Sequence, residues 1–297
     1  MEVIRQFKEI LKEKEIPITY EIYSPRGYKV NPFIDSLSSF KDKIDAITVP
    51  DNPLATLKIS PIAYAHLIKR SLKIDVIPHL TCRDRNSLAL QSEILGAHLL
   101  EIRNLFVTTG DRAAESKGKK EVREVNSIGL CKIIKLMNEG LSPSGEKFES
   151  SERTDFLVGG AIIFGRKNET NVLSKKVDAG FDFFLSQIIY SAEEVINFFN
   201  QIEAQGFELN KPILFGLSPI SSRKTLENIL KMPSFKISAE IREKLVKSTD
   251  IAETSRELCL EVAGQLKNEL TPKYKIGFHL MPFGDDLLGE RIIKEIR

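Results

Sequence analysis

The chain has 297 residues, of which 42% are hydrophobic, so it can bury a large core without disulfides or metal ions. Its 43 Lys and Arg residues nearly balance 41 Asp and Glu residues, and a net charge of +2 argues against a protein that binds nucleic acid through bulk charge. Three separated Cys residues without a C-x-x-C pair, no signal-peptide pattern and no apolar run of about 18 residues predict a cytoplasmic protein with no membrane partner.

The N-terminal residues 1–17 have the apolar spacing of an amphipathic helix. Beyond them, short apolar runs rich in β-branched residues alternate with helical patterns, as is typical of β-α units around a parallel sheet. The runs predict eight strands, at Ile18–Tyr23, Ala46–Val49, Asp75–Leu80, Asn104–Thr108, Phe156–Phe164, Phe183–Gln187, Ile213–Gly216 and Lys275–His279.

Helix signals stand between these strands. Ser60, which is followed by proline, and Asn86 each precede a periodic apolar segment as an N-cap residue does. Three later segments show the same pattern, and two of them end in glycine, at Gly140 and Gly206, as at a helix C-cap. The sequence therefore predicts helices that connect successive strands.

Eight strand–helix repeats in 297 residues match the size of a (β/α)8 TIM barrel. No G-x-G-x-x-G follows the first strand, which weighs against a Rossmann domain. We predict an α/β TIM barrel that forms a single domain over residues 1–297, with an extra N-terminal helix. Residues 112–123 and 141–153 are predicted loops, and residues 232–249 are expected to contribute a helix outside the barrel.

In such a barrel the active site lies at the C-terminal ends of the strands. The polar residues at these ends are Glu21, Thr48, Asp51, Asn52, His79, Thr81, Arg83, Asp84, Asp111, Gln187, Ser218 and His279. Four histidines without H-x-x-H spacing give little support to a metal site, and the absence of G-x-S-x-G argues against a hydrolase. The residues alone predict a barrel enzyme with a polar mouth and no metal.

Three of these residues allow two interpretations each. Glu21 alternates with apolar residues along its strand and should project into the mouth, either as a partner of Arg26 or Arg83 or as a general acid with a raised pKa. Asp111 could orient a ring nitrogen or a pterin by hydrogen bonding, or cap a loop. His79, taken alone, is more typical of a hydrogen-bonded core histidine than of a catalyst.

Taken together, the strand-end segments resemble the methylenetetrahydrofolate reductase family. The segments are YEIYSPRG, DAITVPDNPLA, PHLTCRDRNSLALQSEILGAHLLEIRNLFVTTGD, VNSIGLCKIIKLMNEGLSPSG, KKVDAGFDFFLSQIIY, FGLSPISS and IGFHLMPFG. They follow the family's order over nearly the whole chain. The combination of LTCRDRN, TTGD and KKVDAG-x5-SQ is specific, whereas each motif alone is weak. The sequence is similar to the short microbial members that lack a regulatory C-terminal domain.

This resemblance implies a flavin, usually FAD, across the C-terminal face and the reduction of 5,10-methylenetetrahydrofolate to 5-methyltetrahydrofolate. Glu21 matches the family's acid, which protonates N10 of the folate, and the flavin N5 delivers hydride to the one-carbon unit. Asp111 matches an aspartate near the flavin and the pterin, so the resemblance assigns it to catalysis and to the cofactor site.

The remaining site residues follow from the same resemblance. The expected flavin contacts, besides Asp111, are Thr48, His79, Glu169 and Lys176. Gln187 matches a folate-contacting glutamine, and Ser218 is expected beside the substrate. The partners implied are a folate or related pterin substrate and an electron donor, either NAD(P)H or a partner subunit.

Departures from the family pattern after the fifth strand, and Asn126 at a position that is often acidic, leave the cofactor open between FAD, FMN and no flavin. Two other functions also stay open. One is a flavin-independent enzyme in which NAD(P)H donates hydride directly to the pterin. The other is a non-catalytic pterin-binding or electron-transfer subunit. The sequence leaves open whether the chain forms a homo-oligomer.

Overall fold

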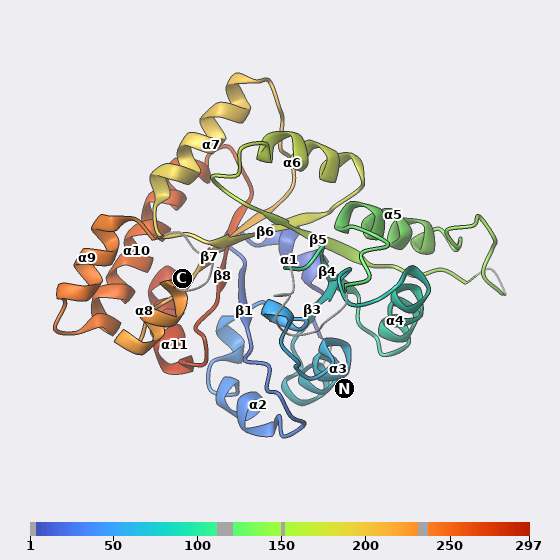
Figure 1. The fold of residues 1–297 in the computed structure, drawn as a ribbon, viewed down its shortest axis with the longest axis horizontal. Coiled ribbons are helices and arrows are strands. Elements are labelled where there is room, and N and C mark those ends of the chain that lie inside the picture. Colours follow the sequence, from blue (N-terminus) through green and yellow to red (C-terminus); the bar gives the residue numbers. More distant parts are fainter. Residues whose placement is uncertain (1–3, 112–120, 150–151, 231–236) are drawn as a thin grey trace.

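Eight parallel strands close into one barrel in chain order, and this is the (β/α)8 fold that the sequence predicts (Figure 1). The structure is a computed structural model that describes residues 4–111, 121–149, 152–230 and 237–297. The strands are β1 (Ile18–Glu21), β2 (Ala46–Val49), β3 (Val76–Thr81), β4 (Asn104–Thr108), β5 (Leu157–Ile162), β6 (Phe183–Ile188), β7 (Ile213–Leu217) and β8 (Ile276–Leu280).

Helices surround the strands on the outer side of the barrel (Figure 1). They are α2 (Asn31–Leu37), α3 (Pro61–Leu72), α4 (Ser87–Leu99), α5 (Ser127–Asn138), α6 (Glu169–Asp178), α7 (Ala192–Ala204), α8 (Arg223–Leu230), α9 (Ala239–Lys247), α10 (Ile251–Leu270) and α11 (Asp286–Ile296). Most of them bury apolar residues at helical spacing, and most of these residues join the large core between the helices and the outer face of the strands.

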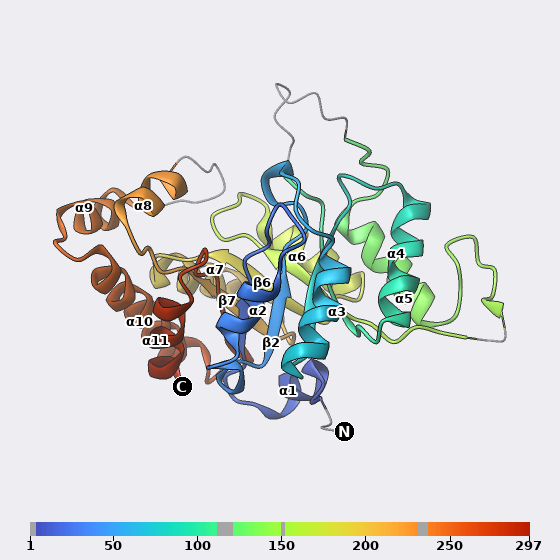
Figure 2. The ribbon, with the colours of Figure 1, turned by 90° about the horizontal axis from the view of Figure 1, so that it is seen from below.

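α1 (Phe7–Glu13) closes the N-terminal end of the barrel (Figure 2). The Phe7 ring meets Phe183 edge to face at 5.5 Å between centroids, and the Phe7 N–H donates a hydrogen bond to Asp75 Oδ2 at 2.9 Å. The inward-facing core at this end consists of Phe7, Ile10, Leu11, Ala46, Ile77, Phe106, Phe183, Leu185 and Leu214. Because apolar side chains fill the lower part of the barrel, a site can form only toward the C-terminal ends of the strands.

The predicted caps at Ser60 and Asn86 are confirmed, whereas Ser191 before α7 makes no side-chain cap hydrogen bond. The Asn86 Oδ1 accepts a hydrogen bond from the Ala89 N–H at 2.8 Å and begins α4. Gly140 and Gly206 follow α5 and α7 with φ of +80° and +69°, which glycine adopts without steric cost. α2 and α6 have no sequence-based prediction, and neither begins with a side-chain cap hydrogen bond. α11 was also missed, although Asp285 caps it.

Two strands end earlier than predicted. β1 ends at Glu21 instead of Tyr23, and β5 covers Leu157–Ile162 instead of residues 156–164. In β5 the reason is local, because the Ile163 N–H donates to the Glu169 carboxylate at 3.0 Å instead of to a neighbouring strand. The Glu169 side chain, at the start of α6, thus ends β5.

The segments outside the alternation are partly described. α9 is the additional helix expected within residues 232–249, and it stands with α8 beside α10 (Figure 2). Most of the predicted loop at 112–123 lies outside the described residues, as do residues 150–151 of the loop at 141–153. In the described part of the chain, no helix is both long enough and apolar enough to cross a membrane.

Candidate active site

Two adjacent cavities open at the C-terminal end of the barrel. We call the first, of about 550 Å³, the β4 cavity because residues 107–111 of β4 and its following loop form much of its wall. The second, of about 440 Å³, contains Glu21 and is called the Glu21 cavity. They share four wall residues: Pro50, Pro53, His79 and Asp111. A bound molecule in one cavity would therefore lie next to a molecule in the other.

Gly110 lets the loop after β4 pack closely against Thr81 and Arg83 in the wall of the β4 cavity. Its φ is +87°, and a Cβ at this position would stand 2.7 Å from Thr81 Oγ1 and 2.9 Å from Arg83 Cβ. Only glycine has both the backbone freedom and the lack of a side chain that this contact requires. Asp111 follows it, is exposed, and lines both cavities.

A buried network around Arg83 fixes the loops that carry this wall. The Arg83 side chain is 1% exposed and donates to the carbonyl oxygens of Asn52 at 3.0 Å and Asp111 at 3.2 Å, while its Nε donates to Asp84 Oδ1 at 2.7 Å. Asp51 is held similarly by the Thr81 N–H at 2.9 Å. Arg83 therefore positions backbone, and its guanidinium is occupied by these contacts instead of facing a ligand.

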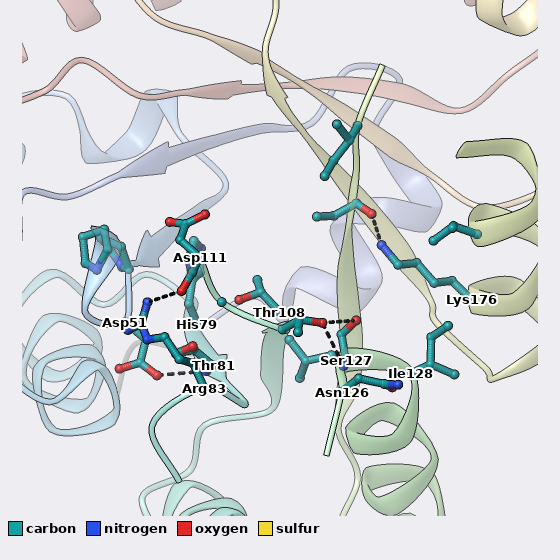
Figure 3. Close-up of a pocket in the computed structure, with 18 of the residues that line it drawn as sticks. Asp51, His79, Thr81, Arg83, Thr108, Asp111, Asn126, Ser127, Ile128 and Lys176 are labelled. Atoms are coloured by element: carbon teal, nitrogen blue, oxygen red, sulfur yellow. Dashed lines mark hydrogen bonds between the residues drawn. The ribbon is translucent and has the colours of Figure 1, made fainter. Parts of the chain in front are cut away.

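The N-terminus of α5 forms the wall of the β4 cavity that lies opposite His79 and Asp111 (Figure 3). Asn126 caps this helix through a hydrogen bond from the Gly129 N–H to its Oδ1 at 2.9 Å. Ser127 and Ile128 line the cavity with it. The N-terminus of a helix carries partial positive charge and unpaired N–H groups, which favours anionic ligands.

Lys176 adds a cation to the same wall (Figure 3). Its side chain is 5% exposed and its ammonium donates to the Ala161 carbonyl oxygen. Burial lowers the pKa of Lys176 to about 8, although the nearby Glu169 carboxylate raises it. Arg166 also lines the cavity and pairs with Glu169. The wall opposite His79 and Asp111 is therefore cationic.

Two buried polar atoms of the β4 cavity have no hydrogen-bond partner among the described residues: Thr81 Oγ1 and His79 Nε2. The His79 ring packs on Phe106 at 4.6 Å between centroids. Burial, with a smaller effect of His279, lowers the pKa of His79 to about 3, so its imidazole is neutral near neutral pH. Unpaired buried polar atoms are uncommon in proteins, and here they mark places for ligand polar groups.

Glu21 lies at the end of β1 on the wall of the second cavity. Within the described residues its carboxyl has no ion pair or hydrogen bond, so the predicted alternative of a pair with Arg26 or Arg83 is wrong. Arg83 instead pairs with Asp84. Burial raises the pKa of Glu21 to about 7. A substantial fraction of the carboxyl is therefore protonated at neutral pH and can donate a proton.

The structure gathers four predicted site residues at the two cavities, namely Glu21, His79, Asp111 and Lys176. Thr48 is fully buried below the Glu21 cavity, and its hydroxyl donates to the Tyr20 carbonyl oxygen at 3.5 Å. Glu169 stands behind the wall of the β4 cavity, where its carboxylate holds Ile163 and Arg166. A direct flavin contact by Thr48 or Glu169 stays a prediction.

Neither of the two predicted substrate residues lines the Glu21 cavity. The side-chain amide of Gln187 donates to the Phe164 carbonyl oxygen at 3.3 Å and lines a separate cavity of about 230 Å³. The Ser218 hydroxyl is fully buried and donates to the Met281 carbonyl oxygen at 2.6 Å. Both residues lie near the C-terminal ends of their strands, as predicted, but their side chains donate hydrogen bonds to backbone carbonyl oxygens.

Sequence reasoning missed Arg166 and the N-terminus of α5 as parts of the wall. The N-cap signal before α5 predicts the helix, and the structure confirms Asn126 as its cap, but the sequence does not indicate that this helix start faces a cavity. No local pattern identifies Arg166, which depends on the turn before α6. Within the described residues, no three His, Cys, Asp or Glu side chains gather into a metal site.

The chain is similar in sequence to known reductases. The sequence model described as "Methylenetetrahydrofolate reductase" matches residues 6–297. The 5,10-methylenetetrahydrofolate reductase of Escherichia coli is 23% identical over 271 residues, which cover 89% of this chain and 85% of that protein. Methylenetetrahydrofolate reductase 1 of Schizosaccharomyces pombe is 23% identical over 218 residues. The match covers 69% of this chain but 33% of the yeast protein, so the chain spans about a third of that relative.

A solved structure of similar fold comes from Clostridium thermocellum. It is an uncharacterized protein described as binding two copies of 5-methyl-5,6,7,8-tetrahydrofolic acid. The two folds superpose with a TM-score of 0.71 and 17% identity, and the match covers 98% of each chain. At this identity the similarity demonstrates a shared fold.

Proposed function

Because this chain belongs to the methylenetetrahydrofolate reductase family, whose named members are oxidoreductases, we propose that it reduces 5,10-methylenetetrahydrofolate, or a related methylene-pterin, to the 5-methyl form with a bound flavin. The observation that carries this proposal is Glu21. Its carboxyl pairs with no residue that the structure describes, has a pKa of about 7 and lies in a cavity that shares a wall with the β4 cavity. An acid therefore stands next to a space suited to a second, larger ligand.

The β4 cavity fits a flavin by the chemistry of its wall. Thr81 Oγ1 and His79 Nε2, which have no hydrogen-bond partner in the described part of the chain, could meet the polar edge of a flavin ring. The N-terminus of α5, with Lys176 and Arg166, suits the phosphate groups of FAD or FMN. When bound, a flavin supplies hydride to the one-carbon unit. The wall favours a flavin with phosphate and does not choose between FAD and FMN.

Glu21 performs the acid step of the proposed reaction. In a methylene-pterin the one-carbon unit bridges two nitrogens, and the bridge opens only if the departing amine at N10 receives a proton. A protonated Glu21 supplies this proton, because its pKa of about 7 keeps the acid form populated at neutral pH. Asp111, which lines both cavities, can accept a hydrogen bond from the pterin or orient the flavin ring.

A folate substrate agrees with the surroundings of Glu21. The Clostridium thermocellum protein that shares this fold is described as binding 5-methyltetrahydrofolic acid, which is the product of the proposed reaction. The Glu21 cavity has apolar side chains around the acid, with Ile22, Leu54, Met281 and Phe283 in its wall. These residues suit planar rings.

The test is the visible spectrum of the protein followed by turnover. We expect flavin absorption that an electron donor bleaches and that methylenetetrahydrofolate restores. Glu21→Gln should keep flavin reduction but lower the folate-dependent reoxidation by about 10²- to 10⁴-fold, the usual contribution of a general acid. Glu208→Gln, which changes an exposed carboxyl before β7, is the matched control and should be unchanged.

Three results would contradict this proposal. A colourless protein that does not bind added flavin, yet oxidises NAD(P)H with methylenetetrahydrofolate, would identify the flavin-independent enzyme. A protein that binds the pterin without turnover would identify a binding subunit. Unchanged folate reduction in Glu21→Gln would remove the acid role from this residue.

A further inference from the structure

The Glu21 cavity has two cationic side chains at its edge, Arg26 and Lys58. Lys58 is already engaged, since its ammonium donates to the Ser24 carbonyl oxygen at 2.6 Å and lies 4.6 Å from the centre of the Tyr23 ring. Arg26 is exposed and makes no ion pair or hydrogen bond with any residue that the structure describes. Its guanidinium is therefore available to an anion at the mouth of the cavity.

Lys58 fixes the loop that carries Arg26. The Lys58 N–H donates to Asn52 Oδ1 at 2.8 Å, and the next residue, Ile59, donates its N–H to the Pro25 carbonyl oxygen at 3.1 Å. Together with the bond to Ser24, these contacts join the loop after β1 to the loop after β2. The backbone next to Arg26 is thus held in place, which reduces the entropy lost when its side chain binds.

Two large apolar side chains stand on either side of Glu21. β1 is paired with β2 on one side and with β8 on the other, so the loops after these strands flank it. The first loop supplies Leu54, which is 42% exposed with φ of +53°, and the second supplies Phe283, which is 41% exposed with φ of +51°. Both line the Glu21 cavity. A left-handed backbone is unfavourable for such residues, and it is typically retained where function needs the side chain.

These contacts lead to one inference, which rests on the proposed function. We propose that Arg26 selects a substrate whose tail ends in carboxylates, while Leu54 and Phe283 hold the aromatic ring that links this tail to the pterin. A folate has this order of groups, with the pterin, then an aminobenzoyl ring, then a glutamate. With its pterin beside Glu21, its ring reaches the two apolar side chains and its carboxylates reach the exposed guanidinium.

The test compares two ligands that differ only in tail charge, namely 5-methyltetrahydrofolate and its diamide, in which both tail carboxylates are neutral. The dissociation constant of each is measured for the wild type, Arg26→Gln and Arg70→Gln. Arg70 is an exposed arginine on α3 that pairs with none of the described residues, and it serves as the matched control. The wild type and Arg70→Gln should bind the acid about tenfold more tightly than the diamide, a modest value for a hydrogen bond between charged groups. Arg26→Gln should bind the two alike.

A second variant separates the ring from the charge. Phe283→Ala should weaken both ligands by a similar factor and keep the preference for the acid, since its effect is on the ring. If Arg26→Gln keeps the wild-type preference, the tail role of Arg26 is overturned while the proposed function stands. If the wild type binds neither ligand, the proposed function itself fails. Because binding is measured without turnover, the two failures are distinguishable.

Discussion

At the scale of single residues, the chemistry depends on Glu21, a partly buried carboxyl that has no counter-ion among the residues the structure describes. Glu21 and His79 show the same physical effect in opposite directions. Burial raises the pKa of the Glu21 acid to about 7 and lowers the pKa of the His79 base to about 3. His79 is therefore neutral near pH 7 and can hydrogen-bond without charge, while a substantial fraction of Glu21 is protonated there and can donate a proton.

The pH dependence of the folate half-reaction follows from this. Glu21 must be protonated to act, so kcat/KM for methylenetetrahydrofolate should be constant below pH 6 and fall about tenfold per pH unit well above 7. Stopped-flow reoxidation of reduced enzyme between pH 5.5 and 9 measures this limb. Reduction of the flavin by its electron donor serves as the control, because Glu21 has no part in that step. A flat folate profile would contradict the assignment.

Strand alternation was enough to place Glu21 and His79 from the sequence, because a period of two decides which side chains face the mouth. The same rule failed to predict the surroundings of Gln187 and Ser218. Each lies at a strand end, but Gln187 donates to the Phe164 carbonyl and Ser218 to the Met281 carbonyl. These partners come from other β-α units, so their approach depends on barrel closure and not on local sequence.

At the scale of elements, the capped first turn of α5 is also part of the wall of the β4 cavity. Asn126→Ala removes the cap hydrogen bond and should lower the free energy of unfolding by about 1 kcal/mol. It should also weaken flavin binding by about fivefold, because the loosened first turn lines the β4 cavity. Asn86→Ala loses an equivalent cap on α4, which is not part of that wall, and should change stability alone. Equal flavin affinity in the two variants would contradict a role for the α5 N-terminus.

The turn after β4 gives a second prediction at this scale. Gly110→Ala places a Cβ 2.7 Å from Thr81 Oγ1, so the turn must move and the flavin should be lost from the purified protein. Gly145→Ala is the matched control, since Gly145 has a similar φ of +85° but no atom within 4 Å of an added Cβ. It should cost only about 1–2 kcal/mol of stability from the left-handed backbone. Flavin content per protein, read from absorbance, compares the two.

At the scale of the whole molecule, the two ends of the barrel have different tasks. α1 fills the N-terminal end, whereas both large cavities open at the other. Phe7→Ala should therefore lower the free energy of unfolding by about 3–5 kcal/mol, because it leaves a hole beside Phe183. Folded Phe7→Ala protein should retain flavin affinity. Chemical denaturation and flavin titration check the two parts, and loss of flavin affinity in folded protein would contradict this separation.

The barrel itself could be predicted from the sequence because each of its eight strands is a short apolar run, and the count and spacing of such runs suffice. The helices α2 and α6 could not, since few apolar side chains mark their buried faces: Ile34 and Leu37 in α2, and Leu173 in α6. The division of the mouth into two cavities also lay beyond the sequence. It results from side chains of distant segments, such as Pro53 and Asp111, that meet only in the closed fold.

The partition formed by Pro50, Pro53, His79 and Asp111 has a thermodynamic consequence. A molecule bound in one cavity contacts residues that also line the other cavity, so the binding free energies of the two ligands are coupled. Linkage is reciprocal: whatever factor the cofactor adds to pterin affinity, the pterin must add to cofactor affinity. Titrating each in the presence and absence of the other closes a cycle, and the two coupling factors obtained must agree.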